Sequence, residues 1–304
     1  MLLAALVWQQ ARAQNDCPPP FEPPTPQQTD AAKQTAADRG YLWRLIKDGR
    51  SSYLYGTLHV ARLAWIFPGP QLALALRNTD TLALELNLSD PSTLERLQQG
   101  IAADPAMAVP VALQRRIDRA AARECVDAQL LKAQRLELQV STLTMAQARR
   151  AGLEPAYGID MLLLGVAQRT AKPVVALETV EEQLRALLGE SEQDSVALTQ
   201  EGLEELESGD GLRLLGTLTD AWARSDFPTL NSYLQWCDCV HSDAERRAMQ
   251  RLLDARNPAM AQRLDALHRS GKRVFAAVGS LHMIGSMGLP TQMQRLGYTV
   301  ERVF

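Results

Sequence analysis

Short apolar runs alternate along the chain with longer stretches that have a helical repeat. The short runs are typical of buried strands, whereas apolar residues at every third or fourth position indicate amphipathic helices. Lys47-Asp48-Gly49-Arg50 separates the first two runs, and Asp-Gly in that place favours a tight hairpin. We expect strands at 42–46, 52–58, 81–86, 173–177, 273–278 and 297–304, the last of them at an edge of the sheet.

Helices are expected between these strands, at 71–78, 91–101, 111–150, 180–188 and 190–269. Glycine and proline interrupt helices, so breaks are expected near Ser208-Gly209, Asp226-Phe227-Pro228 and Asn257-Pro258. Strands separated by helices predict an α/β protein with a central sheet, flanking helices, and a helical subdomain or insertions at about 100–170 and 190–270. Residues 41–304 are expected to form one such domain.

The composition is that of an ordinary globular protein, with 46% hydrophobic and 22% charged residues in a chain of 304. Because 32 basic and 35 acidic side chains leave a net charge of -3, we expect no nucleic-acid partner. The longest apolar run, residues 1–8, is far shorter than the roughly 20 residues of a spanning helix. No mature membrane span is expected, and the oligomeric state stays open.

The N-terminus has features of a secretory signal peptide over residues 1–13. An apolar stretch leads to Ala11-Arg12-Ala13, a small-x-small pattern typical of cleavage sites, although a basic residue after Met1 is missing. The alternative, a first buried element at 1–8, conflicts with six prolines between 18 and 26. We therefore expect an exported protein, periplasmic or secreted, with a Pro-rich extended tether at 14–40.

Four cysteines, Cys17, Cys125, Cys237 and Cys239, allow three pairings into two disulfides. In an exported chain, structural disulfides are favoured over free buried thiols. Cys237 and Cys239 form a CxC pair that would suit a soft metal, but a second pair at zinc-finger spacing is missing from the sequence. We expect bridges to distant partners.

Two of the four histidines occupy the same local pattern, which we call the GxxH frame: Gly56-Thr57-Leu58-His59 and Gly279-Ser280-Leu281-His282. Each frame follows an expected strand. Glycine lets the backbone approach a ligand closely, and open α/β sheets bind ligands at the carboxyl ends of their strands. The alternative is that these histidines only stabilise turns. That interpretation is less favoured because the same pattern occurs twice. His241 and His268 lack the frame.

Two glutamates, Glu85 and Glu178, also follow expected strands. Together with the histidines of the two frames, they could form a His/His/Glu metal site with an open coordination position. The alternatives are structural: a strand-end glutamate can pair with an arginine, and Glu178 directly precedes the helix start at Thr179.

The segments GTLHVA, LALELN, YGID, VVALETVEEQL, DARNPAMAQRL and VFAAVGSLHMIG together resemble the TraB/GumN family, which is related to the Tiki metalloproteases. The resemblance extends from residue 42 to the C-terminus. It implies a central sheet with helices, and a site formed by two GxxH motifs, an early glutamate and a divalent metal. Manganese or cobalt is expected, with zinc or iron as alternatives. Carried over to this chain, the implied metal ligands are His59, His282 and Glu85.

The same resemblance identifies supporting positions in the LET, RN and YGID segments. The matching residues are Glu178, Arg256, Asn257, Tyr157, Gly158 and Asp160. Arg256 would neutralise a developing oxyanion or hold Glu85 or Glu178 in place, unless it is simply an exposed helix arginine.

These features favour a metal-dependent hydrolase, plausibly a peptidase, acting on a peptide or small-molecule substrate. Glu85 or Glu178 would serve as the base if it is not a ligand. Neither HExxH nor GxSxG occurs, so a zincin and a serine hydrolase of the nucleophile-elbow type are not expected. The alternative is a non-catalytic protein that holds a metal, a haem-like ligand or a small peptide in the same crevice.

Overall fold

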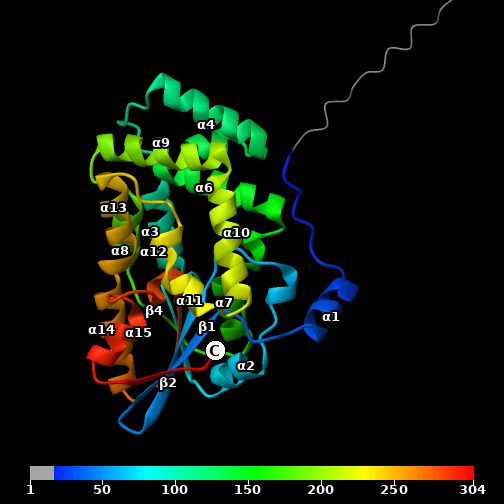
Figure 1. The fold of residues 1–304 in the computed structure, drawn as a ribbon, viewed down its shortest axis with the longest axis vertical. Coiled ribbons are helices and arrows are strands. Elements are labelled where there is room, and N and C mark those ends of the chain that lie inside the picture. Colours follow the sequence, from blue (N-terminus) through cyan, green and yellow to red (C-terminus); the bar gives the residue numbers. More distant parts are fainter. Residues whose placement is uncertain (1–16) are drawn as a thin grey trace, which may run out of the picture.

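The computed structural model describes residues 17–304, so the expected signal peptide lies outside the described residues. Six strands form one mixed sheet in the order β4-β3-β5-β2-β1-β6 (Figure 1). Strands β4, β3, β5 and β2 run parallel to one another, and β1 is antiparallel to both β2 and β6. The strands span Tyr41–Lys47 (β1), Arg50–Thr57 (β2), Thr81–Leu84 (β3), Val174–Ala176 (β4), Val274–Gly279 (β5) and Thr299–Arg302 (β6).

Each expected strand is present, and the α/β fold class is confirmed. The β1–β2 hairpin turns at Asp48 and Gly49, whose φ angles of 51° and 69° are both positive. Two-residue hairpin loops of type I′ require this backbone conformation, which explains why Asp-Gly occurs here. Strand β6 closes the sheet at the edge beside β1, as expected.

Helices α2 (Pro70–Arg77), α7 (Ile159–Arg169), α10 (Asp210–Ala223), α14 (Asn257–Arg269) and α15 (Leu289–Arg295) pack on the sheet. Helices α3 (Pro91–Ile101) and α8 (Val180–Leu187) pack on each other. The main core combines strand residues such as Phe275 and Leu54 with helix residues such as Leu164 and Trp222. The indole Nε1 of Trp222 donates a 2.8 Å hydrogen bond to the carbonyl of Gly56. This bond ties α10 to the strand that carries the first GxxH frame.

The expected helical subdomain lies beyond the sheet at one end of the molecule (Figure 1). It consists of α4 (Val111–Glu124), α5 (Ala128–Lys132), α6 (Leu136–Ala148) and α9 (Glu192–Ser208), which share a second hydrophobic core. The stretch 111–150 is thus not one helix. Cys125 ends α4 in the left-handed conformation, and Asp127 then caps α5 with its side chain.

The stretch after α9 breaks at the expected glycine and prolines, and at two further places. Helices α11 (Phe227–Asn231), α12 (Tyr233–Trp236) and α13 (Asp243–Met249) follow α10. The CxC segment separates α12 from α13, and a π-helical turn at Gln250–Asp254 precedes α14. Such turns frequently mark functional sites.

The expectation of an extended tether is wrong for part of 14–40. Helix α1 (Pro26–Gln34) forms within it, because Thr25 and Gln28 make a capping box and proline starts the helix. The segment also packs on the domain: Ala32 is buried, and the ring of Phe21 meets Tyr157 edge-on at 5.7 Å.

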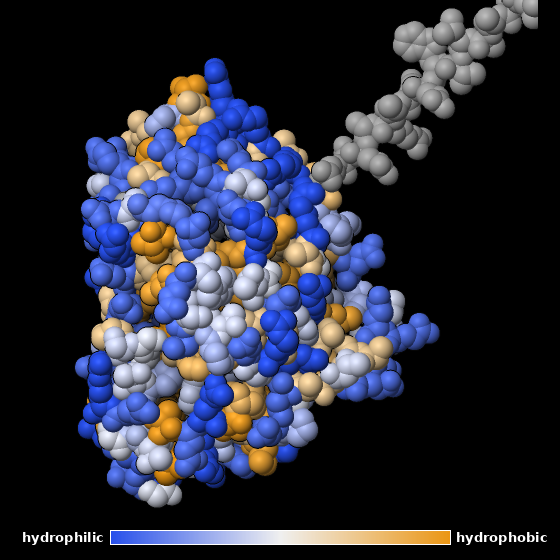
Figure 2. Space-filling model, in the orientation of Figure 1, coloured by the Kyte–Doolittle hydropathy of each residue, from blue (hydrophilic) through white to orange (hydrophobic). Residues whose placement is uncertain are grey.

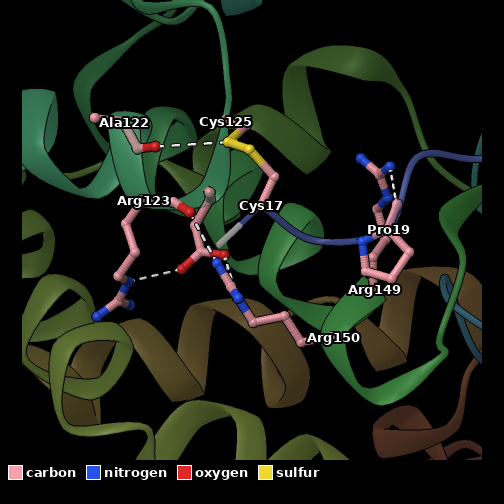
Figure 3. Close-up of a disulfide and its surroundings, with 8 residues drawn as sticks. Cys17, Pro19, Ala122, Arg123, Cys125, Arg149 and Arg150 are labelled. Carbon is pink, nitrogen blue, oxygen red and sulfur yellow. Dashed lines mark hydrogen bonds and ion pairs between the residues drawn. A yellow bond between two sulfur atoms is a disulfide. The ribbon is translucent and has the colours of Figure 1, made fainter. Parts of the chain in front are cut away.

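Two disulfides join the four cysteines: Cys17–Cys125 and Cys237–Cys239. The first links distant positions, as expected. The second corrects our expectation, since the CxC cysteines bridge to each other. In Figure 3 the Cys17–Cys125 bond lies beside Arg123 and Arg150. Both guanidinium groups bind the buried carboxylate of Glu124, at 2.8 Å each.

One face of the molecule is largely polar (Figure 2). On the face shown in Figure 2, hydrophobic side chains are scattered among hydrophilic ones. Within residues 17–304, each helix is too short or too polar to cross a membrane.

Helix α8 provides a test of the electrostatics near the sheet edge. Glu182 completes a capping box with Thr179 and pairs with Arg263 at 2.7 Å, and this pairing lowers its pKa to about 2. Replacing Glu182 with glutamine should cost about 0.5–1 kcal/mol of unfolding free energy at neutral pH. The depressed pKa makes this contribution complete above the unfolded-state value of about 4.3 and lost as the pH falls toward 2.

Urea unfolding at neutral and acidic pH checks this prediction. The control is Glu181→Gln, because Glu181 lies in the same turn but is exposed and 3.8 Å from Arg96. An equal loss in both variants, or a Glu182→Gln loss that persists at pH near 2, would contradict it.

Candidate functional site

The carboxyl ends of the four parallel strands place both GxxH frames and both glutamates at one edge of the sheet. Strands β2 and β5 are neighbours, with Thr57 opposite Gly279. The frames therefore emerge side by side. The hydroxyl of Ser280 donates a 2.8 Å hydrogen bond to the carbonyl of Thr57. A Cβ on Gly56 would lie only 3.0 Å from that hydroxyl, so close packing of the frames favours glycine there.

Gly279 is the point where three of the expected site residues converge. A Cβ on it would lie 3.4 Å from Glu85 Oε1, 3.7 Å from His282 Cδ2 and 3.9 Å from His59 Nε2. Strand-end residues from β2, β3 and β5 thus surround one position. A methyl group at this position would be in ordinary van der Waals contact with all three side chains.

His59 is oriented by Asp160, at the start of α7. The imidazole Nδ1 lies 2.8 Å from Asp160 Oδ2, and the hydroxyl of Thr57 donates to Asp160 Oδ1 at 2.5 Å. The negative charge of Asp160 raises the pKa of His59 to about 9. The His59 side chain is still 64% exposed, so its Nε2 atom is accessible from solvent.

His282 is buried and oriented by Asn257, the first residue of α14. Its Nδ1 donates to Asn257 Oδ1 at 2.7 Å, while the Asn257 amide donates to the carbonyl of Met287 at 2.9 Å. This arrangement directs Nε2 of His282 toward Glu85, whose Oε1 is 3.9 Å away. Burial lowers the pKa of His282 to about 4, so the ring is neutral at pH 7.

Glu85 accepts hydrogen bonds from three donors. They are the Gly279 amide at 2.8 Å, Gln183 Nε2 at 3.0 Å and Arg256 Nη2 at 2.7 Å. Burial alone would raise the pKa of Glu85, but the neighbouring positive charges and the Gly279 amide outweigh it and lower the pKa to about 2. Since His282 is neutral at pH 7, Arg256 is the main stabilising charge under those conditions.

Glu178 lies on the other side of Arg256. Its two oxygens accept from Arg256 Nε at 2.8 Å and Nη2 at 2.5 Å. Its side chain is only 2% exposed, and burial raises its pKa despite the arginine. Glu178 faces a separate cavity of about 240 Å³ beside Arg185 and Arg251. Its position suits a residue that holds Arg256 rather than one that reaches the histidines.

The segment before α14 sets the position of Arg256. The arginine follows the π-helical turn and donates from Nη1 to the carbonyl of Leu252 at 2.9 Å. Its side chain is 10% exposed and bridges the two glutamates. Arg256 is therefore not an exposed helix arginine. It links the glutamates that follow β3 and β4.

A cavity of about 340 Å³ opens beside His59 and Glu85. Its lining includes Asp160, Gly158 and Gln183, together with side chains of α3, α6 and α7. Gly158 is required for close approach, because a Cβ there would lie 2.7 Å from the carbonyl of His59.

The structure brings together most of the expected site residues: His59, His282, Glu85, Glu178, Arg256, Asn257 and Asp160. It does not bring Tyr157 to them, since that ring packs on Phe21 outside the cavity lining. Gln183 was not identified as a site residue from the sequence. Its position in the first turn of α8, directly after β4, is the signal that could have indicated it. His268 is buried between Ser52 and the carbonyl of Lys47, whereas His241 is exposed.

Imidazole and carboxylate groups are the side chains that could serve as ligands of a divalent metal here. Each imidazole has its Nδ1 hydrogen-bonded to a side-chain oxygen, and metal-binding histidines are usually held in this way. Nε2 of the neutral His282 has a free lone pair at pH 7, whereas His59, whose pKa is raised to about 9, must first release its Nε2 proton. Within residues 17–304, however, no group of three or more His, Cys, Asp or Glu side chains forms a ready ligand cluster. A ligand role for Glu85 competes with its hydrogen bond to Arg256.

The fold and these motifs place the chain in a family: it belongs to the TraB/PrgY/gumN family, whose sequence model matches residues 41–302. This confirms the resemblance seen in the motifs. The chain is similar to the uncharacterized protein YbaP of Shigella flexneri, with 27% identity over 272 residues that cover 85% of this chain and 96% of that protein. YbaP of Escherichia coli (strain K12) is 26% identical over 272 residues, with the same coverage. Solved structures yield no significant match.

Proposed function

We propose that the protein is a metal-dependent hydrolase that cleaves peptide bonds. The observation that carries the proposal is the convergence at Gly279 of His59 Nε2, the His282 ring and a Glu85 oxygen, with both histidines held through Nδ1. Two imidazoles and a carboxylate at one point are a set of donors that binds divalent metals with open positions.

His59, His282 and Glu85 would hold the metal, with manganese or cobalt as the expected ions. A bound divalent metal would polarise the substrate carbonyl and lower the pKa of a bound water. Asp160 and Asn257 hold the two rings through Nδ1, so that Nε2 of each ring would face the metal. Arg256 would keep Glu85 ionised through the hydrogen bond that its Nη2 atom donates to Oε2.

Export is part of the proposal. Disulfides persist in oxidising compartments and are rare in the cytosol, so the Cys17–Cys125 and Cys237–Cys239 bonds support a periplasmic or secreted protein.

Metal content of the protein purified without a histidine tag tests this function. Wild type should hold close to one manganese, cobalt, iron or zinc ion per chain after reconstitution. His59→Ala and His282→Ala should each lose at least about tenfold in metal affinity and lose cleavage of a peptide library, because each removes one donor. Mass spectrometry and a cleavage assay with and without metal measure these effects.

His241→Ala is the matched control, because His241 is exposed and lies outside the cluster. Full metal binding and full cleavage in both frame variants would overturn the proposal. Saturable binding of metal or peptide without any product would instead favour a binding protein that uses the same crevice.

A further inference from the structure

The cavity beside His59 and Glu85 has mostly apolar walls. Leucines from β3 and the loop after it form one side, and side chains of α3, α6 and α7 form the other. The apolar lining residues are Leu84, Leu86, Leu88, Leu97, Met145, Pro155, Met161 and Leu164. The volume of about 340 Å³ lies near the lower end of the roughly 300–1,000 Å³ typical of small-molecule sites.

The charged groups in the lining are already paired. Asp160 accepts from Thr57 and faces His59, and Glu85 accepts from Arg256. Among the described residues that line the cavity, none is lysine or arginine. Away from His59, a charged group entering the cavity would therefore lose its hydration without gaining a partner, whereas an apolar group would gain from burial.

The cavity lies next to the candidate metal ligands, since His59 and Glu85 belong to its lining. Met161 of α7 is 50% exposed, so it lies where the cavity meets solvent. Met145 of α6 also lines the cavity, and unbranched thioethers adapt to apolar groups of different shape.

We propose that this cavity binds one bulky apolar side chain of a peptide substrate, such as leucine, methionine or phenylalanine. The carbonyl group next to that residue then lies at His59 and Glu85, a placement that rests on the function proposed above. The apolar walls make Met161 and Leu97 specificity-determining residues.

Binding to the metal-free chain tests the cavity without relying on catalysis. The probes are peptides of the form N-acetyl-Ala-X-Ala-amide with X as Phe, Leu, Ser or Asp, and ligand-observed NMR gives their dissociation constants. The Phe and Leu peptides should bind at least about tenfold more tightly than the Ser peptide, because a single hydrophobic pocket discriminates by this order. The Asp peptide should bind no more tightly than the Ser peptide.

Two variants of Met161 locate the preference in the cavity. Met161→Gln and Met161→Glu should bring the Phe and Ser peptides to within about threefold of each other, because a polar group then replaces the apolar surface where the cavity meets solvent. The matched controls are Leu74→Gln and Leu74→Glu, since Leu74 is also 50% exposed but lies on α2, outside the lining. Thermal unfolding confirms that each variant is folded.

A cleavage assay with manganese on the same peptides separates this inference from the proposed function. Equal binding of the Phe and Ser peptides by wild type, or equal kcat/KM for both, would overturn the apolar cavity. An apolar preference in binding, lost in the Met161 variants, with no cleavage of any peptide would support the cavity and count against the hydrolase.

Discussion

Replacing Arg256 with leucine should lower the free energy of unfolding by about 3–5 kcal/mol, the usual cost of removing one partner from a buried ion pair. The guanidinium lies between two carboxylates that are 11% and 2% exposed, those of Glu85 and Glu178. Without it, both negative charges stay buried beside each other. Urea unfolding at neutral pH measures the loss.

The control is Arg44→Leu. Arg44 also binds a carboxylate through two nitrogens, that of Glu301, but the pair is exposed on the strands at the sheet edge. Its removal should cost less than about 1 kcal/mol. Adding Glu178→Gln to Arg256→Leu should recover part of the loss, because it removes one of the stranded charges. Equal losses in the Arg256 and Arg44 variants would contradict the assignment of Arg256 as the link between two strand ends.

Removing the Cys17–Cys125 disulfide by a double serine substitution should cost about 4–5 kcal/mol in the chain-entropy description of cross-links. This disulfide closes a loop with a sequence separation of 108. The loop contains β1, β2, β3 and the whole of α4. Breaking the bond greatly increases the freedom of the unfolded chain, so the urea midpoint should fall.

The second disulfide is the internal control. Cys237 and Cys239 are separated by two positions, so the same relation predicts a loss of only about 1.5 kcal/mol when both become serine. A larger loss for this pair than for Cys17 and Cys125 would show that native-state contacts, rather than loop closure, dominate the effect.

The strands and the placement of the frames were predictable because they depend on local patterns. An apolar run ending in Gly-x-x-His is visible in the sequence, and parallel strands share a carboxyl edge. The hairpin was predictable for the same reason, since Asp48 and Gly49 both take positive φ angles.

The partners of the site residues were harder to predict, because they come from packing between distant segments. Gln183 reaches Glu85 because the fold packs α8 on α3, and the sequence around Gln183 resembles that of other amphipathic helices. The pairing of Cys237 with Cys239 depends on the left-handed conformation of Asp238, whose φ is 48°. The helix α1 was missed because prolines suggested extended chain, although proline also starts helices.

The strand order constrains the sequence of events by which the protein folds. Strand β5 lies between β2 and β3, yet it is the second-last strand along the chain. Until the chain as far as residue 279 is available for folding, the β1–β2 hairpin and the β3–β4 pair have no strand to join them, and the two GxxH frames cannot come together. Pairing of such distant segments is slow, and unpaired strand edges invite aggregation meanwhile.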